Sequence, residues 1–158
     1  MIKVLFVCLG NICRSPMAEG IFKQQVEEAG LENKISCDSA GIIGYHAGEL
    51  PDKRMRRTAS AHGITLEHFS RQLKMADFEE FDYILGMDAN NMKAIKQMES
   101  SVTNKKATIF KMREFDEHES GKDVEDPYYQ GDEGFEICYQ VLLKSSQNFL
   151  SYISEKKI

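Results

Sequence analysis

The sequence predicts a single α/β domain over residues 1–158, with a parallel β-sheet covered by helices on both faces. Three observations lead to this expectation. A chain of 158 residues suits one domain with a sizeable core. Hydrophobic residues make up 42% and charged residues 28%, as in ordinary soluble globular proteins. Segments with strand and helix patterns alternate along the chain, which is typical of such a sheet.

A buried strand and an amphipathic helix are expected at the start of the chain. Residues 2–8 form a short continuous apolar run, typical of a buried parallel strand. Ser15 and Pro16 then indicate the N-cap and the first residue of a helix. Gly30 is a good stop for that helix. Apolar residues recur between these limits at helical spacing, at Ala18, Ile21, Phe22, Val26 and Ala29.

The rest of the chain continues the alternation. Further strands are expected over residues 35–41, 81–87 and 108–110, and a helix over residues 51–62. Asp88 can cap another helix after the third strand. A long amphipathic helix is expected to end the chain, with apolar residues at Phe135, Cys138, Val141, Leu142, Phe149 and Ile153.

Composition and charge exclude several classes of protein. The formal net charge of -5 argues against a broad nucleic-acid or anionic-membrane surface, but not against one small positive pocket. No stretch approaches the roughly 20 apolar residues of a membrane span. The apolar run at the start is short and is interrupted by Asn11 and Arg14, which disfavours a signal peptide. We therefore expect a cytoplasmic protein that binds neither nucleic acid nor membrane. A monomer is also expected, although the sequence carries no firm signal on dimers.

The four cysteines indicate chemistry rather than a metal site or a disulfide framework. They form no C-x-x-C pair, and no Cys/His cluster has zinc spacing, so no metal is expected. Structural disulfides are rare in reducing compartments. A chemical role for at least one cysteine is then a hypothesis to weigh. Cys37 and Cys138 are expected in the core.

The loop after the first strand has the strongest functional pattern. In parallel α/β folds, ligands bind beyond the carboxyl ends of strands, and this loop has the pattern C-x5-R-S from Cys8 to Ser15. Its backbone N–H groups and the positive start of the next helix can form an anion nest. Arg14 adds a planar fork that can hold two phosphate oxygens. Cys8 at the bottom of this nest would favour the thiolate over the thiol.

A plain alternative is that Cys8 is only a buried cysteine that ends a strand, as free cysteines often are. The bare C-x5-R pattern is weak. Between a strand and a helix near the N-terminus it is strong, and it favours a nucleophile. Gly10 and Asn11 fit such a tight loop because both tolerate backbone angles that other residues resist.

Residues 7–19, with the sequence VCLGNICRSPMAE, resemble the signature of the low-molecular-weight protein tyrosine phosphatases. The match continues in the family's order through residues 39–41, 45–46, 62–64, 81–85 and 126–129. The resemblance therefore covers nearly the whole chain. It implies a three-layer sandwich with a four-stranded parallel sheet flanked by helices, and an enzyme without metal or cofactor. Its partners would be tyrosine-phosphorylated proteins, with inorganic phosphate or vanadate as inhibitors.

The resemblance also implies three catalytic residues. Cys8 would form a phosphocysteine intermediate, and Arg14 would bind the phosphate. Asp126 would protonate the departing phenolate and then activate water against the phosphocysteine. By itself, an Asp-Pro pair usually starts a turn. The phosphate would lie against the loop residues Leu9, Gly10, Asn11, Ile12, Cys13 and Arg14.

The aromatic ring of the substrate would lie among apolar and aromatic side chains at the entrance. Leu9 and Ile12 would form its walls, and Tyr45 would stack on it. Tyr128 and Tyr129 would line the entrance, and in some family members such tyrosines are phosphorylated. The plain alternative for these tyrosines is ordinary surface or turn residues.

Polar residues that the family uses to support the loop match Ser15, Asn11, Ser39, His68 and Asp88. Ser15 could cap the helix, worth about 1 kcal/mol, and also donate a hydrogen bond to the Cys8 sulfur. For His68 and Asp88, structural and catalytic-support roles both stay open. Cys13 is expected to capture oxidised Cys8 in a protective disulfide, or else to fill the underside of the loop.

Three rival functions remain as alternatives. An arsenate reductase on the same fold would need further cysteines, but residues 83–98 contain none and Cys138 falls in the terminal helix. A protein arginine phosphatase has threonine where this chain has Ile12, whose apolar side chain suits an aromatic wall better. A phosphate- or phosphotyrosine-binding module without activity would lack Cys8 or Asp126, and both are present.

Overall fold

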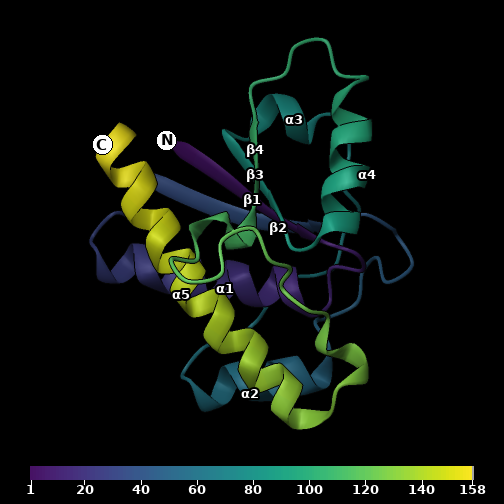
Figure 1. Ribbon diagram of the computed structural model, residues 1–158, viewed down its shortest axis with the longest axis vertical. Helices are drawn as coiled ribbons and strands as arrows, with labels where there is room; N and C mark the ends of the chain where they lie inside the picture. Colours follow the sequence, from purple (N-terminus) through teal and green to yellow (C-terminus); the bar gives the residue numbers. More distant parts are fainter. Residues whose placement is uncertain (158) are drawn as a thin grey trace.

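The computed structural model describes residues 1–157 and confirms the predicted α/β class (Figure 1). Its sheet is fully parallel and has the order β2-β1-β3-β4. The strands are β1 (Ile2–Cys8), β2 (Ile35–Gly41), β3 (Tyr83–Gly86) and β4 (Thr108–Lys111). The apolar N-terminal run thus occupies a central strand, where both of its faces are buried.

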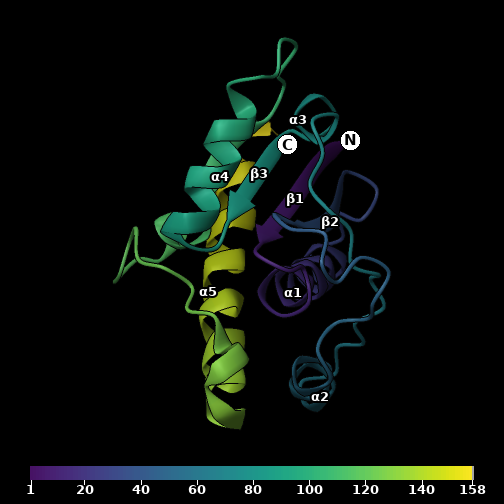
Figure 2. The ribbon, with the colours of Figure 1, turned by 90° about the vertical axis from the view of Figure 1, so that its right-hand side faces the viewer.

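Helices cover both faces of the sheet, so the predicted three-layer sandwich is confirmed (Figures 1 and 2). One face carries α1 (Arg14–Glu28) and α5 (Gly131–Lys157), and α2 (Lys53–Ala61) packs against α5. The other carries α3 (Asp77–Glu80) and α4 (Ala89–Glu99). None of the helices within residues 1–157 combines the length and apolar character needed to cross a membrane.

Alternate side chains of β1 enter two separate cores. Phe6 points toward α1 and α5. Its ring packs edge-on against Phe22 with centroids 5.5 Å apart, and Phe22 packs against Phe149 at 5.6 Å. Leu5 points the other way, into the core that includes Phe78 and Ile95. Because side chains alternate along a strand, a continuous apolar run is what a doubly covered strand requires.

The N-terminal end of α1 differs from the prediction. The helix begins at Arg14, so Ser15 lies inside it and the prediction that Ser15 is the N-cap is wrong. Cys13 occupies the cap position, and no side chain bonds the first amides. The physical reason is that the Ser15 hydroxyl is used by the loop instead, 2.8 Å from Asn11 Nδ2.

Other element ends agree with the sequence to within a few residues. The helix stop at Gly30 is confirmed, with a φ of 71°. Asp52 caps α2 by accepting from the Arg54 amide, and Asp88 caps α4 as predicted. The third strand is shorter than expected, and the short helix α3 was not predicted. Two 3-10 turns complete the fold, Met112–Phe115 and Pro127–Tyr129.

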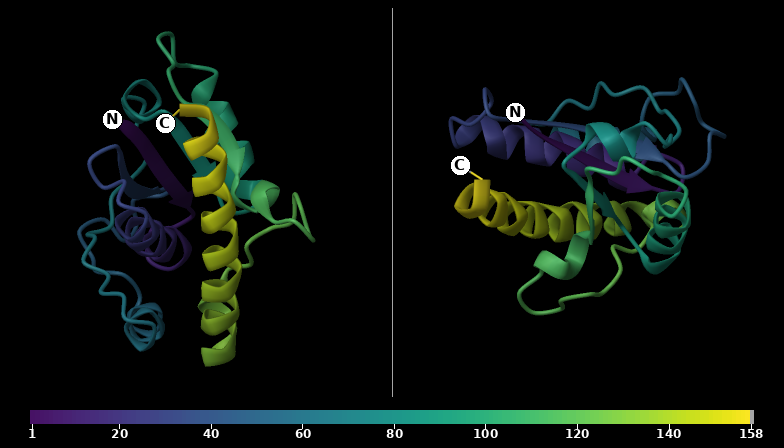
Figure 3. Two further views of the ribbon diagram at one scale, coloured as in Figure 1. Left: turned by 90° about the vertical axis from the view of Figure 1, so that its left-hand side faces the viewer. Right: turned by 90° about the horizontal axis from the view of Figure 1, so that it is seen from above.

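The carboxyl ends of the parallel strands form one edge of the sheet, and the chain termini lie together at the opposite end (Figures 1 and 3). The loop after β1 therefore meets the segments that follow β2 and β3. Cys8 pairs in register with Gly41, so both strands end at the same level. This edge is where the predicted site residues gather.

Candidate active site

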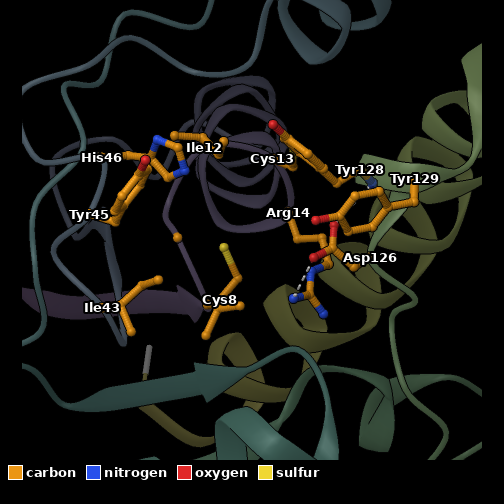
Figure 4. A pocket seen from close by; sticks show the side chains of 12 residues that line it. Cys8, Ile12, Cys13, Arg14, Ile43, Tyr45, His46, Asp126, Tyr128 and Tyr129 are labelled. Carbon is orange, nitrogen blue, oxygen red and sulfur yellow. Dashed lines mark hydrogen bonds and ion pairs between the residues drawn. The ribbon is translucent and has the colours of Figure 1, made fainter.

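The loop from Cys8 to Arg14 curls around a cavity of about 270 Å³ at this edge (Figure 4). The Cys8 side chain points into the cavity from the end of β1. The lining comprises Cys8, Leu9, Gly10, Ile12, Cys13, Arg14, Ile43, Tyr45, His46, Asp126, Tyr128 and Tyr129. The cavity brings together every predicted catalytic and substrate-lining residue. It also includes Ile43 and His46, for which the sequence suggested no role.

Asn11 fixes the shape of the loop. It has a φ of 57°, in the left-handed region that few residues other than glycine adopt. Its side chain is 0% exposed and donates to Ser15 Oγ (2.8 Å) and Ser39 Oγ (3.0 Å). Its side-chain oxygen Oδ1 accepts from the Arg71 amide (3.0 Å) and contacts His68 Nε2 (2.8 Å). Asn11 therefore supports the anion loop from beneath.

Neighbouring segments hold the carbonyl groups of the loop. The bonds join Ile42 N to Cys8 O (2.9 Å), Ile43 N to Leu9 O (3.0 Å), Ser70 Oγ to Gly10 O (3.1 Å) and Asp52 N to Ile12 O (2.7 Å). In contrast, within residues 1–157 no such bond uses the amides of residues 10–13. An anion nest requires this arrangement, in which the carbonyls bond the surroundings and the amides stay available for the anion.

A chain of hydrogen bonds orients the Ser15 hydroxyl toward the Cys8 sulfur. Ser15 Oγ lies 3.0 Å from Cys8 Sγ and 3.4 Å from the Ala40 carbonyl. Because Asn11 Nδ2 already donates to this oxygen, the hydroxyl proton remains for one of those two acceptors. The shorter contact favours the sulfur.

The Arg14 guanidinium forms one wall and is 2% exposed. Its Nη1 donates to Asp88 Oδ2 (2.6 Å) and to the Val124 carbonyl (2.9 Å), and its Nη2 lies 3.6 Å from Asp126 Oδ2. Burial opposes its charge, but Cys8, Asp88 and Asp126 outweigh burial and raise the pKa of Arg14. Asp88 thus caps α4 through the Asn91 amide and also orients the Arg14 guanidinium, so it has both a structural role and a contact in the site.

Asp126 lies across the cavity from the loop, on the segment before α5 (Figure 4). Its side chain is 41% exposed, and Oδ1 accepts from the Tyr128 amide at 3.1 Å. The segment is held at one end by the bond from Val124 N to Met87 O (2.8 Å). At the other end, Arg54 Nη1 donates to the Tyr128 carbonyl at 3.0 Å. One carboxylate oxygen is therefore fixed, and the other faces the Arg14 fork.

Aromatic side chains form the rim. Tyr45 and Tyr129 line the cavity but are 82% and 91% exposed, so most of each ring is available for contact with a substrate. Tyr128 packs edge-on against Tyr129, with ring centroids 4.9 Å apart. Leu9 and Ile12 also line the cavity and add apolar surface, as predicted. Such a rim suits a planar aromatic group entering above the anion loop.

A second polar layer lies behind Asn11. Ser39 Oγ donates to Glu19 Oε1 at 2.6 Å, and His68 Nδ1 lies 3.3 Å from both Glu19 and Asp38. Glu19, Asp38 and His68 are close enough to share a metal ion. Their polar atoms already have protein partners, however, because Arg71 bonds Asp38 and the second His68 nitrogen contacts Asn11. We therefore interpret them as support for the loop.

Three of the four cysteines are buried and one is half-buried. Cys13 lines the same cavity as Cys8, and burial strongly raises its pKa. Cys138 is in the core as predicted, where burial raises its pKa to about 12. Cys37, on the edge strand β2, is half-buried and packs against the same core, so the expected core position is only partly reached there.

Comparison with known proteins gives the relatives of this chain. Residues 3–158 match the family model described as "Low molecular weight phosphotyrosine protein phosphatase". The relative of that name from Schizosaccharomyces pombe is 44% identical over 154 residues, 97% of each chain. A protein tyrosine phosphatase from Entamoeba histolytica has a TM-score of 0.91, with 38% identity and 100% of both chains covered.

An arginine phosphatase from Drosophila, DARP, is also similar in structure. Its TM-score is 0.92, with 34% identity over 99% of this chain and 100% of the other. The fold is thus common to solved structures named for two phosphatase activities, so the fold alone does not determine the substrate. The family model matches the chain from residue 3, in β1, through α5. The chain belongs to the low molecular weight phosphotyrosine protein phosphatase family.

Proposed function

We propose that the protein hydrolyses phosphotyrosine in protein substrates, with Cys8 as nucleophile, Arg14 as phosphate ligand and Asp126 as general acid and base. The main supporting observation is that these three side chains converge on one cavity, 3.6 Å separating the Arg14 fork from the Asp126 carboxylate. The available amides of residues 10–13 supply further donors for the phosphate.

In the first step, the Cys8 thiolate attacks phosphorus and the bond between phosphorus and the phenolic oxygen breaks. Asp126 donates its proton to the departing oxygen, so tyrosine leaves as a neutral phenol. The phosphoryl group remains on sulfur as a phosphocysteine. Arg14 and the loop amides hold its equatorial oxygens, where negative charge is concentrated.

In the second step, water attacks the phosphocysteine. The Asp126 carboxylate takes a proton from this water as the new bond to phosphorus forms. The sulfur–phosphorus bond breaks and Cys8 leaves as a thiolate, which the Ser15 hydroxyl at 3.0 Å can stabilise. Inorganic phosphate is the product, and the enzyme returns to its starting protonation state. Phosphate and vanadate are therefore expected inhibitors.

Phosphoarginine is the second candidate substrate because the Drosophila arginine phosphatase is similar in structure. The cavity favours the aryl ester. Ile12 and Leu9 present apolar atoms beneath the rim, and Tyr45 adds an exposed aromatic face. Among the lining residues, the only carboxylate is Asp126, and it already faces Arg14. A guanidinium group is best bound by a carboxylate, and the lining has no second carboxylate to offer it.

The test compares hydrolysis of matched peptides that contain phosphotyrosine or phosphoarginine, with EDTA present throughout. We expect the phosphotyrosine peptide to be preferred and the activity to be absent in Cys8→Ser. EDTA should leave the rate unchanged because the thiolate supplies the nucleophile and Arg14 the positive charge. Activity that EDTA abolishes and a divalent ion restores would refute the mechanism, and a preference for phosphoarginine would refute the substrate.

Cellular substrates would be identified by trapping. Cys8→Ser or Asp126→Ala in a lysate should retain tyrosine-phosphorylated proteins, and vanadate should release them.

Free thiols at all four cysteines are compatible with the cytoplasmic location expected from the sequence.

A further inference from the structure

The first turns of α2 form a basic surface beside the cavity. Four of five consecutive residues, 53–57, are cations in a chain whose net charge is -5. The exception, Met55, is fully buried and fixes how the helix is oriented. Lys53, Arg56 and Arg57 are spaced by three and four positions, so they share one side of the helix. We call these three residues the basic face.

The basic face has no carboxylate partner within the described chain. Arg54 is different, since it pairs with Asp52 at 3.0 Å and lies over the Tyr128 ring at 5.0 Å. Within residues 1–157, no carboxylate oxygen lies within 4.0 Å of a side-chain nitrogen of the basic face. Arg56 Nε donates to the Pro51 carbonyl at 3.0 Å, which leaves its two terminal nitrogens available.

The start of α2 is attached to two walls of the cavity. The Asp52 amide bonds the Ile12 carbonyl at 2.7 Å, and Ile12 is part of the apolar lining. Two residues later, Arg54 donates to the Tyr128 carbonyl on the rim. Figures 1 and 2 show α2 beside the first turns of α5, at the same end of the molecule as this rim. The basic face therefore begins next to the entrance.

Carboxylates near the entrance do not cancel this charge. Glu49 pairs with His46 at 3.1 Å, and Asp52 is used by Arg54. Glu136 of α5 pairs with His62 at the end of α2 at 2.8 Å, and Asp132 and Glu133 belong to the first turn of α5. The positive field is thus confined to α2, with an acidic helix start as its neighbour. A positive surface beside a negative one favours ligands that are negatively charged and that place this charge against α2.

We infer that the basic face binds acidic residues that flank the phosphotyrosine of a protein substrate. The inference depends on the proposed function, because it extends the same site along the substrate chain. Its reach is adequate: Lys53 to Arg57 span about 6 Å along the helix, at 1.5 Å per residue. An extended peptide advances about 3.3 Å per residue, so acidic side chains two positions apart on a bound peptide match this span.

The experiment measures kcat/KM for three phosphotyrosine peptides whose flanking residues are Asp/Glu, Asn/Gln or Lys, and for a small aryl phosphate. Each exposed charge pair contributes modestly, so two or three pairs predict about a tenfold preference for the acidic over the neutral peptide at low salt. The preference should shrink as salt approaches about 0.5 M, because the pairs are exposed.

Two variants remove the charge. K53Q/R56Q/R57Q should reduce the preference to less than twofold while leaving turnover of the aryl phosphate unchanged. K53Q/R57Q removes only the two exposed members of the face and should lose most of the preference without affecting folding. The matched control, K34Q/K93Q/K96Q, removes three exposed lysines and should keep the full preference.

The outcomes separate this inference from the proposed function. Absence of hydrolysis of every phosphotyrosine substrate would refute the function itself. Hydrolysis of all three peptides at equal rates, or a preference that persists in both variants, would overturn the role of the basic face alone. The same holds if K53Q/R57Q lowers binding to anionic phospholipid vesicles but not the peptide preference, since the face would then recognise a membrane surface.

Discussion

Replacing Arg14 with lysine tests whether the guanidinium fork, rather than its charge, binds the phosphate. The structure allows the donors to be counted. Both hydrogens of Nη1 are used, one by Asp88 and one by the Val124 carbonyl. Nε and Nη2 remain, and together they form the two-point edge that can hold two phosphate oxygens. A lysine ammonium has only three donors.

The expected magnitude follows from this count. If lysine satisfies Asp88 and the Val124 carbonyl, one donor is left for the phosphate instead of two. The loss of one charge-assisted hydrogen bond is worth about 1.5–3 kcal/mol. That corresponds to about a 10- to 150-fold decrease in kcat/KM, because each 1.36 kcal/mol is a factor of ten.

The assay measures kcat/KM for an aryl phosphate and the inhibition constants of phosphate and vanadate, with circular dichroism as the check on folding. In Arg14→Lys, kcat/KM should fall and both inhibition constants should rise. Arg56→Lys, in which the same exchange is made outside the cavity, is the control. Kinetics within threefold of wild type for Arg14→Lys would show that the loop amides alone hold the phosphate.

Three further predictions concern leaving groups, oxidation and acid stability. Asp126→Ala should slow poor leaving groups by about 10²–10⁴-fold and acidic ones much less, and equal losses across substituted phenyl phosphates would contradict the general-acid role. After treatment with peroxide and then a dithiol, Cys13→Ser should recover less activity than wild type or Cys138→Ser. The reason is that Cys13 can capture the sulfenic acid of Cys8 as a disulfide, with release of water. Equal recovery would leave Cys13 a packing role. Arg113 holds the pKa of Asp116 at about 2, so the stability from this pair is complete above about pH 4 and is lost as pH falls through 2. Urea unfolding of Arg113→Gln should therefore show a flatter dependence on pH in that window, and a curve parallel to wild type would argue against the pair.

Local patterns were sufficient to predict the framework of the fold. Residues 2–8 and 35–41 were expected as strands and are strands with those bounds, because continuous apolar or small-residue runs mark buried parallel strands. The short helix α3 was missed because its residues, 77–80, are too few to show a helical period. The role of Ser15 was half right, since its hydroxyl contacts Cys8 Sγ but does not cap the helix.

The support behind the loop could not be predicted in full, because it joins residues that are distant in sequence. Arg71 reaches Asn11 across 60 positions and Asp38 across 33. Arg54, which fixes the Asp126 segment through Tyr128, is 74 positions from its acceptor. No local spacing distinguishes these arginines from the other cations of the chain, and only the folded sheet edge brings them to the site.

Asn11 has a consequence for the energetics of phosphate binding. Glycine would adopt its left-handed backbone easily but would leave the Ser39 and Ser15 hydroxyls and the Arg71 amide without their partner. In such a variant, ordering of the loop would be coupled to anion binding, and the apparent affinity would fall by the fraction of molecules with a competent loop. In the native chain, folding has already ordered the loop. The interaction energy of the phosphoryl group is then available to lower the reaction barrier instead of being spent on reorganisation.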